Sequence, residues 1–348
     1  MTMLTVDGAT GGGQILRSAL TYSALSGRAV RVVGIRAGRP KPGLQAQHLL
    51  AVKAMTELCG ADVAGAKLGS SEVTFDPGPI APPAEWRLDI GTAGSVMLIL
   101  QALLPCLALA PTPVDLTLTG GTNNPWAPPV EYFQHVLLPV LARMGVRVHA
   151  ELASRGFYPK GGGRLRVRTQ PLGAIKPVVA TERGSLARVW GISYSSNLPE
   201  HIAERMTRAC RERLADHGLA STECLIDTTT PSPGPGCGII ALAEFEHAIL
   251  AGDALGERGK PAEEVGREAA DALARDVRTG AAVDSHLADQ LVPWVALARG
   301  DSAYLTARRT DHLVSGIAVA EQVIGARSEL WGEEPAEVRC RGVGPGAR

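Results

Sequence analysis

Two hydrophobic patterns alternate along the first half of the chain. Short runs rich in β-branched and aliphatic residues, such as Leu4–Val6 and Val114–Leu118, are typical of strands. Between such runs, apolar residues recur at spacings of three and four, as they do from Val136 to Leu141. This spacing places apolar side chains on one face of a helix. The pattern therefore predicts a mixed α/β protein.

One short unit recurs: a strand, a helix, a glycine and then a second strand. The helices predicted in this half are Ile15–Ser26, Leu44–Cys59, Ala93–Leu109 and Pro129–Met144. Glycine follows several of them, which is typical of a helix C-cap. The recurrence favours repeated βα modules in mixed sheets with helices packed behind, although a coincidental alternation would give the same pattern.

The pattern changes between Glu182 and Gly280. Strands are predicted at Val189–Ser193, Cys224–Asp227 and Gly238–Glu244, with charged or polar-faced helices at His201–His217 and Pro261–Val277. After this stretch, long apolar helices and short strands return. We therefore expect a large domain from residues 1–183 and 279–348, interrupted by a smaller α/β domain at residues 184–278.

Composition excludes several classes of protein. The 348 residues contain 35 Lys+Arg and 35 Asp+Glu, and 45% are hydrophobic. These values exclude a disordered, collagen-like or polybasic chain, so a nucleic acid would have to be held by a local basic site. The six cysteines form no CxxC pair, and the chain start resembles no signal peptide. We expect a reduced, cytoplasmic protein that does not enter a membrane.

A glycine loop joins the first strand to the first helix. Gly11, Gly12 and Gly13 lie where backbone N–H groups at a helix N-terminus could bind an anion. The loop lacks the lysine and the spacing of a nucleotide-binding P-loop. A plain tight turn explains the glycines equally well.

A basic loop precedes the second helix. Arg36, Arg39 and Lys41 lie among glycines and prolines, and Arg17 follows the glycine loop. Arginine forks bind phosphate through paired hydrogen bonds, so we favour a phosphate site over a solvated basic loop.

Two further polar residues have a plain structural explanation. Gln101 lies within the most apolar helix, where an interior glutamine with internal partners is expected more often than a ligand contact. His312 lies at the start of a predicted helix, so a surface or capping role is the simpler interpretation. No histidine belongs to a clear metal-binding motif.

Taken together, these stretches resemble the RNA 3′-terminal phosphate cyclase family from Val6 to about Leu330. Seven motifs occur in the family's order: GGGQILRSAL, IRAGRPKPGLQAQHL, DIGTAGS, GGTNNPWAPP, GFYPKGGG, HLADQL and DHL. The resemblance implies three βα repeats interrupted by a small α/β insert, a fold related to the enolpyruvyl transferases. It also implies ATP-dependent conversion of an RNA 3′-phosphate into a 2′,3′-cyclic phosphate.

The resemblance assigns roles to particular residues. The family's nucleophilic histidine falls on His312, which would carry AMP before its transfer to the RNA end as RNA(3′)pp(5′)A. The phosphate- or RNA-binding basic residues fall on Arg17, Arg36, Arg39 and Lys41. Nucleotide contacts fall on Gln101, His286, Leu287, Ala288, Asp289 and Gln290. ATP and Mg²⁺ or Mn²⁺ are implied, with no metal ligand identified.

The sequence departs from the family at three places. The acidic residue that usually precedes the glycines is absent, and Asp7 or Asp289 is a candidate substitute. Asn123 stands where the family usually has an acidic residue. Leu-Val-Ser-Gly-Ile follows His312, where Leu-Leu-Thr-Asn-Ile is usual.

Three other functions remain open at this stage. A non-catalytic cyclase-like protein of ribosome assembly would bind RNA without forming a covalent AMP, but such relatives lack the histidine. An enolpyruvyl transferase would need matched anion sites in both halves, which we do not find. Adenylation of 5′-phosphate ends would use the same histidine. The oligomeric state, monomer or homodimer, is left open.

Overall fold

The computed structural model describes residues 3–125, 127–220 and 223–345. Its first module is a four-stranded sheet with two helices. In chain order its elements are β1 (Leu4–Asp7), α1 (Gln14–Ser26), β2 (Val30–Val33), α2 (Ala46–Cys59), β3 (Asp62–Ala64) and β4 (Val73–Asp76). Strands β1 and β2 are parallel, β4 pairs antiparallel with both β2 and β3, and the sheet order is β1-β2-β4-β3.

The second module repeats this topology. Its elements are β5 (Glu85–Asp89), α3 (Val96–Ala108), β6 (Val114–Gly120), a broken helix, β7 (Val148–Ser154) and β8 (Gly163–Thr169). The broken helix consists of α4 (Val130–Tyr132), the π-helix η1 (Phe133–Leu137) and α5 (Leu138–Arg143). The sheet order β5-β6-β8-β7, with β5 and β6 parallel, matches that of the first module.

The third module is split by the insert. Strand β9 (Val179–Ala180) precedes the insert, and the rest of the module follows it: α8 (Ser285–Leu297), β14 (Arg299–Thr306), α9 (Asp311–Ile324), β15 (Arg327–Gly332) and β16 (Ala336–Val343). Strands β9 and β14 are parallel, and β16 lies between β14 and β15. The three modules therefore share one strand order, as the recurrence in the sequence predicts.

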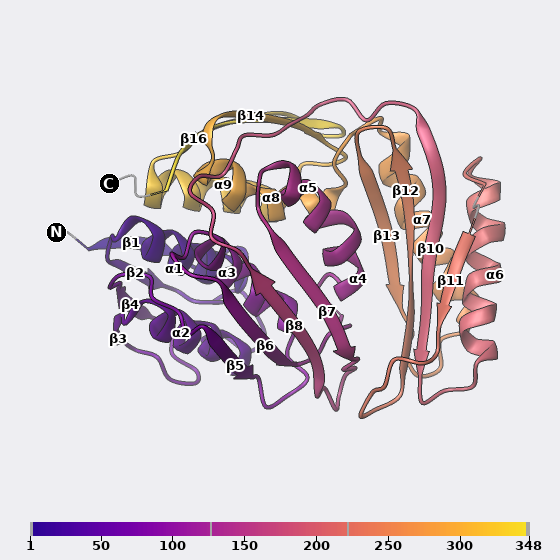
Figure 1. Cartoon of the computed structure of the whole chain (residues 1–348), viewed down its shortest axis with the longest axis horizontal. Helices are drawn as coiled ribbons and strands as arrows, with labels where there is room; N and C mark the ends of the chain where they lie inside the picture. Colours follow the sequence, from indigo (N-terminus) through magenta and orange to yellow (C-terminus); the bar gives the residue numbers. More distant parts are fainter. Residues whose placement is uncertain (1–2, 126, 221–222, 346–348) are drawn as a thin grey trace.

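The segment between β9 and α8 forms a fourth sheet with its own helices. Its elements are β10 (Leu186–Ser196), α6 (His201–Asp216), β11 (Glu223–Asp227), β12 (Gly236–Phe245), β13 (Ile249–Leu255) and α7 (Ala262–Arg278). Helices α6 and α7 pack against this sheet (Figure 1). The residues between them form a separate hydrophobic cluster. The division of the chain into two domains at 184 and 278 stays a prediction.

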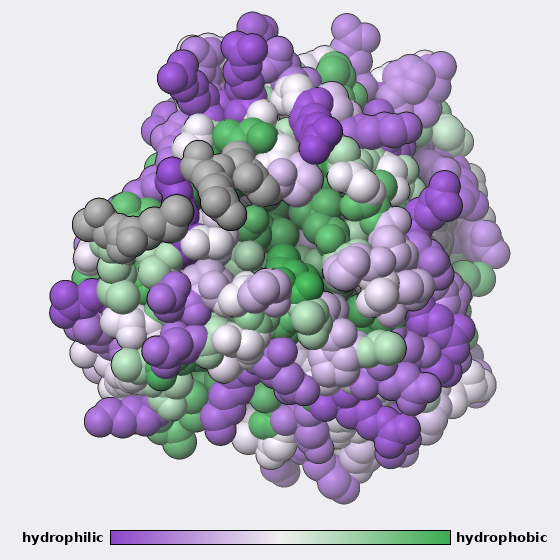
Figure 2. Space-filling model, turned by 60° about the vertical axis from the view of Figure 1, so that its left-hand side comes forward, coloured by the Kyte–Doolittle hydropathy of each residue, from purple (hydrophilic) through white to green (hydrophobic). Residues whose placement is uncertain are grey.

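The helices of the three modules share one interior (Figure 1). Alternating residues of the strands are buried, as in β6 and β8, so each sheet turns one apolar face inward. Helix α1 contacts α2, α3 and α9, and α8 contacts α3 and α9. Figure 2 shows one face of the molecular surface, which is largely hydrophilic. Apolar residues gather in a hollow near the middle of that face.

Several predicted boundaries were wrong. The single helix expected over Pro129–Met144 is broken by a π-helical stretch, and α3 begins at Val96 rather than Ala93. The strand expected just after Gly145 begins at Val148 and runs to Ser154. Strand β8 begins at Gly163, the last residue of the GFYPKGGG motif.

A buried arginine joins the second module to the insert. Arg155 forms ion pairs with Glu131 of α4 and, at 2.8 Å, with Asp227 of β11, and its side chain is only 3% exposed. Its guanidinium also lies over the ring of Tyr194 in β10. Asn123 donates to Glu131 Oε2 at 2.9 Å, so the amide that departs from the family pattern belongs to this network.

We expect the Arg155→Met variant to lower the free energy of unfolding by about 3–5 kcal/mol. Removing the cation leaves Glu131 buried without its charged partner, which costs more than the pair contributed. Urea denaturation would measure the change. The matched control is Arg166→Met, because Arg166 pairs with Asp115 at the surface, where Arg168 also pairs with it. Equal effects of the two variants would contradict a special role for the buried pair.

Candidate functional site

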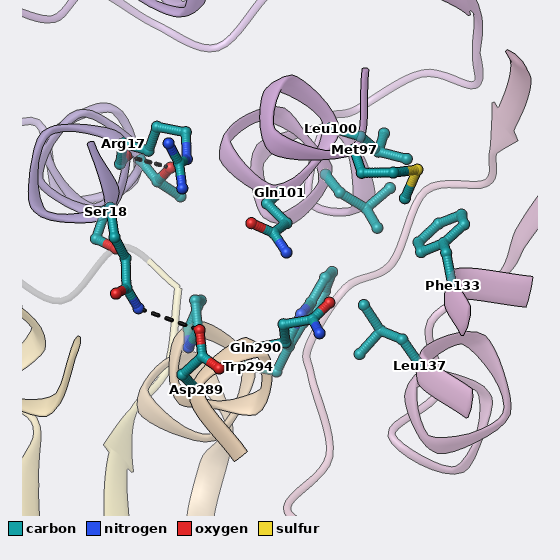
Figure 3. A pocket seen from close by; sticks show the side chains of 14 residues that line it. Arg17, Ser18, Met97, Leu100, Gln101, Phe133, Leu137, Asp289, Gln290 and Trp294 are labelled. Atoms are coloured by element: carbon teal, nitrogen blue, oxygen red, sulfur yellow. Dashed lines mark hydrogen bonds between the residues drawn. The ribbon is translucent and has the colours of Figure 1, made fainter. Parts of the chain in front are cut away.

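A pocket opens where helices from different modules meet (Figure 3). Its walls come from α1, α3, η1 and α8. The apolar part is lined by Met97, Leu100, Leu104, Phe133, Leu137, Pro293 and Trp294, and the polar part by Gln14, Arg17, Ser18, Thr21, Gln101, Asp289 and Gln290. A pocket with an apolar wall and a few convergent polar groups is the usual form of a small-molecule site.

Three of the predicted ligand contacts face one another across this pocket. Gln101 projects from α3, and Asp289 and Gln290 project from the facing side of α8 (Figure 3). Gln101 is half-buried and lines the pocket rather than the apolar interior. The Gln290 amide donates to the His286 carbonyl at 3.0 Å, which limits its movement.

Hydrogen bonds of Gln14 connect His312 to the pocket. The imidazole Nδ1 of His312 hydrogen-bonds Gln14 Oε1. The amide nitrogen of the same glutamine donates to Asp289 Oδ2 at 3.3 Å and to the His312 carbonyl at 3.2 Å. The hydroxyl of Thr310 caps α9 by accepting from the N–H of Leu313 at 3.1 Å. The start of α9 is therefore fixed beside the start of α1.

Charges around the pocket favour a neutral histidine. Partial burial, together with the positive charges of Arg17 and Arg39, lowers the pKa of His312. Burial lowers the pKa of Arg17 to about 10, so it still carries its charge at neutral pH. Burial raises the pKa of Asp289 to about 6, although Arg17 and His286 oppose that shift. A neutral imidazole beside two guanidinium groups can act as a nucleophile towards an anionic ligand.

The glycine loop allows close packing at the start of α1. Gly12 has a φ of +62°, and a Cβ there would lie 3.3 Å from Arg39 Nη2. A Cβ on Gly13 would lie 2.3 Å from His48 Nε2, which leaves no room for a side chain. Glycine at these positions lets Arg39 and His48 approach the backbone of the loop.

His48 is a buried neutral histidine next to this loop. Burial, followed by the charges of Arg17 and Arg36, lowers its pKa to about 4. Its Nδ1 accepts from the N–H of Gln45 at 3.3 Å, which completes the cap of α2. Neither His48 nor Gln14 was among the predicted site residues. Both lie within motifs that carry the family resemblance, His48 in IRAGRPKPGLQAQHL and Gln14 in GGGQILRSAL, directly after the three glycines.

The other predicted residues have different placements. The Arg36 guanidinium donates to the carbonyls of Lys41 and Gly43, so it shapes the basic loop on which Lys41 is exposed. Leu287 and Ala288 have side chains 1% and 0% exposed, packed in the core. Side-chain contacts from this segment to a ligand can therefore come from His286, Asp289 and Gln290, but not from Leu287 or Ala288.

The candidate substitutes for the missing acidic residue differ in position. Asp289 lines the pocket, whereas Asp7 Oδ1 accepts from the N–H of Ala9 at 2.9 Å and stabilises the turn before the glycines.

Trp126 of the GGTNNPWAPP motif lies outside the described residues. Within the ranges that are described, no cluster of three or more His, Cys, Asp or Glu could hold a metal ion. No helix there is long and apolar enough to cross a membrane.

The comparisons with known proteins agree along nearly the whole chain. The family model described as RNA 3′-terminal phosphate cyclase matches residues 9–330. The chain is 46% identical over 346 residues to the RNA 3′-terminal phosphate cyclase of Thermococcus onnurineus, covering 98% of this chain and 100% of that protein. It is 43% identical over 353 residues to the RNA 3′-terminal phosphate cyclase of Methanopyrus kandleri, covering 99% and 100%.

A solved structure gives a much weaker likeness. The enolpyruvyl transferase NikO from Streptomyces tendae is 12% identical, with a TM-score of 0.41, and the match covers 100% of this chain and 50% of that one.

We expect His48 to make the protein less stable in acid. Its folded-state pKa of about 4 lies below the ordinary value of 6.5, so the unfolded chain binds the proton more readily. His48 does not reduce the free energy of unfolding above about pH 6.5. As the pH falls from 6.5 towards 4, the free energy of unfolding decreases because the unfolded chain takes up the proton first. Between pH 7 and 4.5 this amounts to about 2 kcal/mol, from 1.36 kcal/mol per unit of pKa shift.

Urea denaturation at the two pH values, compared with the His48→Gln variant, checks this expectation. The variant should lose about 2 kcal/mol less stability than the natural protein over this interval. Asp289 contributes with the opposite sign, but it is present in both proteins and cancels in the difference. An identical pH dependence of the two proteins would show that His48 does not titrate as described.

Proposed function

The chain belongs to the RNA 3′-terminal phosphate cyclase family of enzymes, and we propose that it forms the cyclic end through a covalent AMP on His312. The observation that supports this most strongly is the series of contacts from His312 through Gln14 to Asp289 in the pocket. These contacts connect a neutral imidazole to a pocket that has an apolar wall and convergent polar groups.

In the first step, His312 Nε2 attacks the α-phosphorus of ATP. A P–N bond forms, the bond to the bridging oxygen breaks, and pyrophosphate leaves with the electron pair. Charge builds up on the phosphoryl oxygens in the transition state, and fixed cations stabilise it. Arg17 and Arg39 are the cations whose charge acts on His312, so they are suited to this role.

Two further steps complete the reaction. An oxygen of the RNA 3′-phosphate attacks the same phosphorus, the P–N bond breaks, and its electrons return to Nε2. The RNA end is then RNA(3′)pp(5′)A. The neighbouring 2′-OH attacks the RNA phosphorus, loses its proton and displaces AMP, which leaves the 2′,3′-cyclic phosphate. The last step is intramolecular and gains from proximity.

We place the adenosine part of ATP in the pocket and its phosphates towards the loops. The apolar wall would cover the base, while Gln101, Asp289 and Gln290 would supply hydrogen bonds. Arg39 and Lys41, both exposed on the basic loop, would take phosphates of ATP or of the RNA end. His286 is exposed at the start of α8, and its contact with the nucleotide stays a prediction.

The metal implied by the resemblance does not fit a preformed protein site among the described residues, which hold no group of three or more His, Cys, Asp or Glu that could bind it. We expect Mg²⁺ or Mn²⁺ to enter on the phosphates of ATP as part of the substrate, and no step above passes through it.

The histidine tests this proposal directly. The protein is incubated with ATP labelled at the α-phosphate and Mg²⁺ or Mn²⁺, without RNA, and separated under denaturing conditions. We expect a label on the natural protein that is labile in acid and stable in base. His312→Ala should lose it, while the control His247→Ala, which changes an exposed histidine beside Glu246, should keep it.

Comparing RNA and DNA 3′-phosphate ends as acceptors then distinguishes the transfer of AMP from the cyclisation step. RNA with a 3′-phosphate should remove the label and yield the cyclic end, whereas a DNA 3′-phosphate, lacking the 2′-OH, should stop at the adenylated end. A label that persists in His312→Ala would contradict the proposed nucleophile. Binding of RNA without any label would favour the non-catalytic function, and transfer to 5′-phosphate ends would reveal the related side activity.

A further inference from the structure

The orientation of the Gln14 side-chain amide is settled by its surroundings. Its nitrogen lies 3.3 Å from Asp289 Oδ2 and 3.2 Å from the carbonyl oxygen of His312. Both of these atoms accept hydrogen bonds, so they require the NH₂ group of the amide. A flipped amide would place its oxygen against two acceptors, which is unfavourable. The amide oxygen therefore faces the imidazole.

This orientation fixes the tautomer of His312. An amide oxygen can only accept, so the Nδ1 that contacts it must carry the proton. The lone pair of the neutral ring is then on Nε2. A neutral histidine that lacks such a partner carries its proton mostly on Nε2, which would leave the wrong nitrogen free. The partner of one ring nitrogen thus decides the state of the other.

Packing holds the amide in this place. Gln14 is the first residue of α1, and a Cβ on Gly316 of α9 would lie 3.5 Å from Gln14 Nε2. The Ser315 hydroxyl donates to the His312 carbonyl at 3.2 Å, the same oxygen that Gln14 reaches. The amide is therefore set between α1, α8 and α9, one helix from the first module and two from the third.

We propose that Gln14 is a positioning residue that holds the proton of His312 on Nδ1 and so presents Nε2 as the nucleophile. This inference rests on the proposed adenylation of His312. Gln14 acts through His312 and takes no proton itself, because an amide oxygen is a very weak base.

The balance of the reaction follows from this arrangement. When Nε2 bonds to the α-phosphorus and pyrophosphate leaves with the electron pair of the broken P–O bond, the Nδ1 proton stays on the ring. The ring then carries positive charge, which Gln14 Oε1 stabilises through the same hydrogen bond. When the RNA phosphate attacks, the P–N electrons return to Nε2 and the neutral tautomer is restored. No proton enters or leaves His312 in either step.

Two variants test the proposal. Gln14→Met keeps the length of the side chain but removes the acceptor. Gln322→Met is the matched control, because Gln322 also links α9 to the N-terminal segment, by donating to the Thr5 carbonyl at 2.8 Å. That residue lies near the other end of α9.

We expect Gln14→Met to slow the single-turnover formation of protein-bound AMP by about 100-fold at saturating ATP, the scale of a misplaced catalytic group. Gln322→Met should match the natural protein. ¹⁵N NMR of histidine-labelled protein should show the His312 proton on Nδ1 in the natural protein and mostly on Nε2 in Gln14→Met.

The spectra and the kinetics test the role of Gln14 and the proposed adenylation of His312 separately. A natural protein with the proton on Nε2, or a Gln14→Met variant with unchanged adenylation, would overturn the role of Gln14. A natural protein that forms no AMP adduct on His312 would instead overturn the proposed function. The ¹⁵N spectrum of the natural protein decides the tautomer by itself, even if a variant fails to fold.

Discussion

Each of the three small sheets must cover its inner apolar face, and the placement of the helices follows from this requirement. Strands such as β6 and β8 bury every second residue and leave the others partly or fully exposed, so each sheet needs helices on one side only. Each module supplies two helical segments, and those of all three modules meet in a common interior (Figure 1). The place where α1, α3 and α8 approach one another is therefore set by the covering of the sheets.

That meeting place also contains the polar side chains. Gln14, Gln101 and Asp289 belong to three different helices, yet their side chains line the same pocket. Buried or half-buried polar groups need partners, and they find them across the helix boundaries, as the bond from Gln14 to Asp289 shows. The insert is attached by a second polar network around Arg155, on the other side of the broken helix. Both networks join elements that are distant in sequence.

Much of the fold was visible in the sequence, because periodicity and glycine caps are local signals. The prediction of repeated βα modules with an α/β segment between them, and of a helix start at His312, followed from such signals. The π-helix at Phe133–Leu137 and the start of β8 at Gly163 depend on pairing and packing across the chain, which no local pattern encodes. The roles of Gln14 and His48 were hidden for the same reason: their partners are Asp289 and His312 for one, and Gly13 and Arg17 for the other.

A crystal structure of the protein incubated with ATP and Mg²⁺ would show directly whether His312 carries AMP. We expect continuous density from Nε2 of His312 to the phosphorus of AMP, with Nδ1 still on Gln14 and the adenosine in the pocket lined by Gln101 and Trp294. AMP attached through another residue, or adenosine bound outside this pocket, would contradict this expectation.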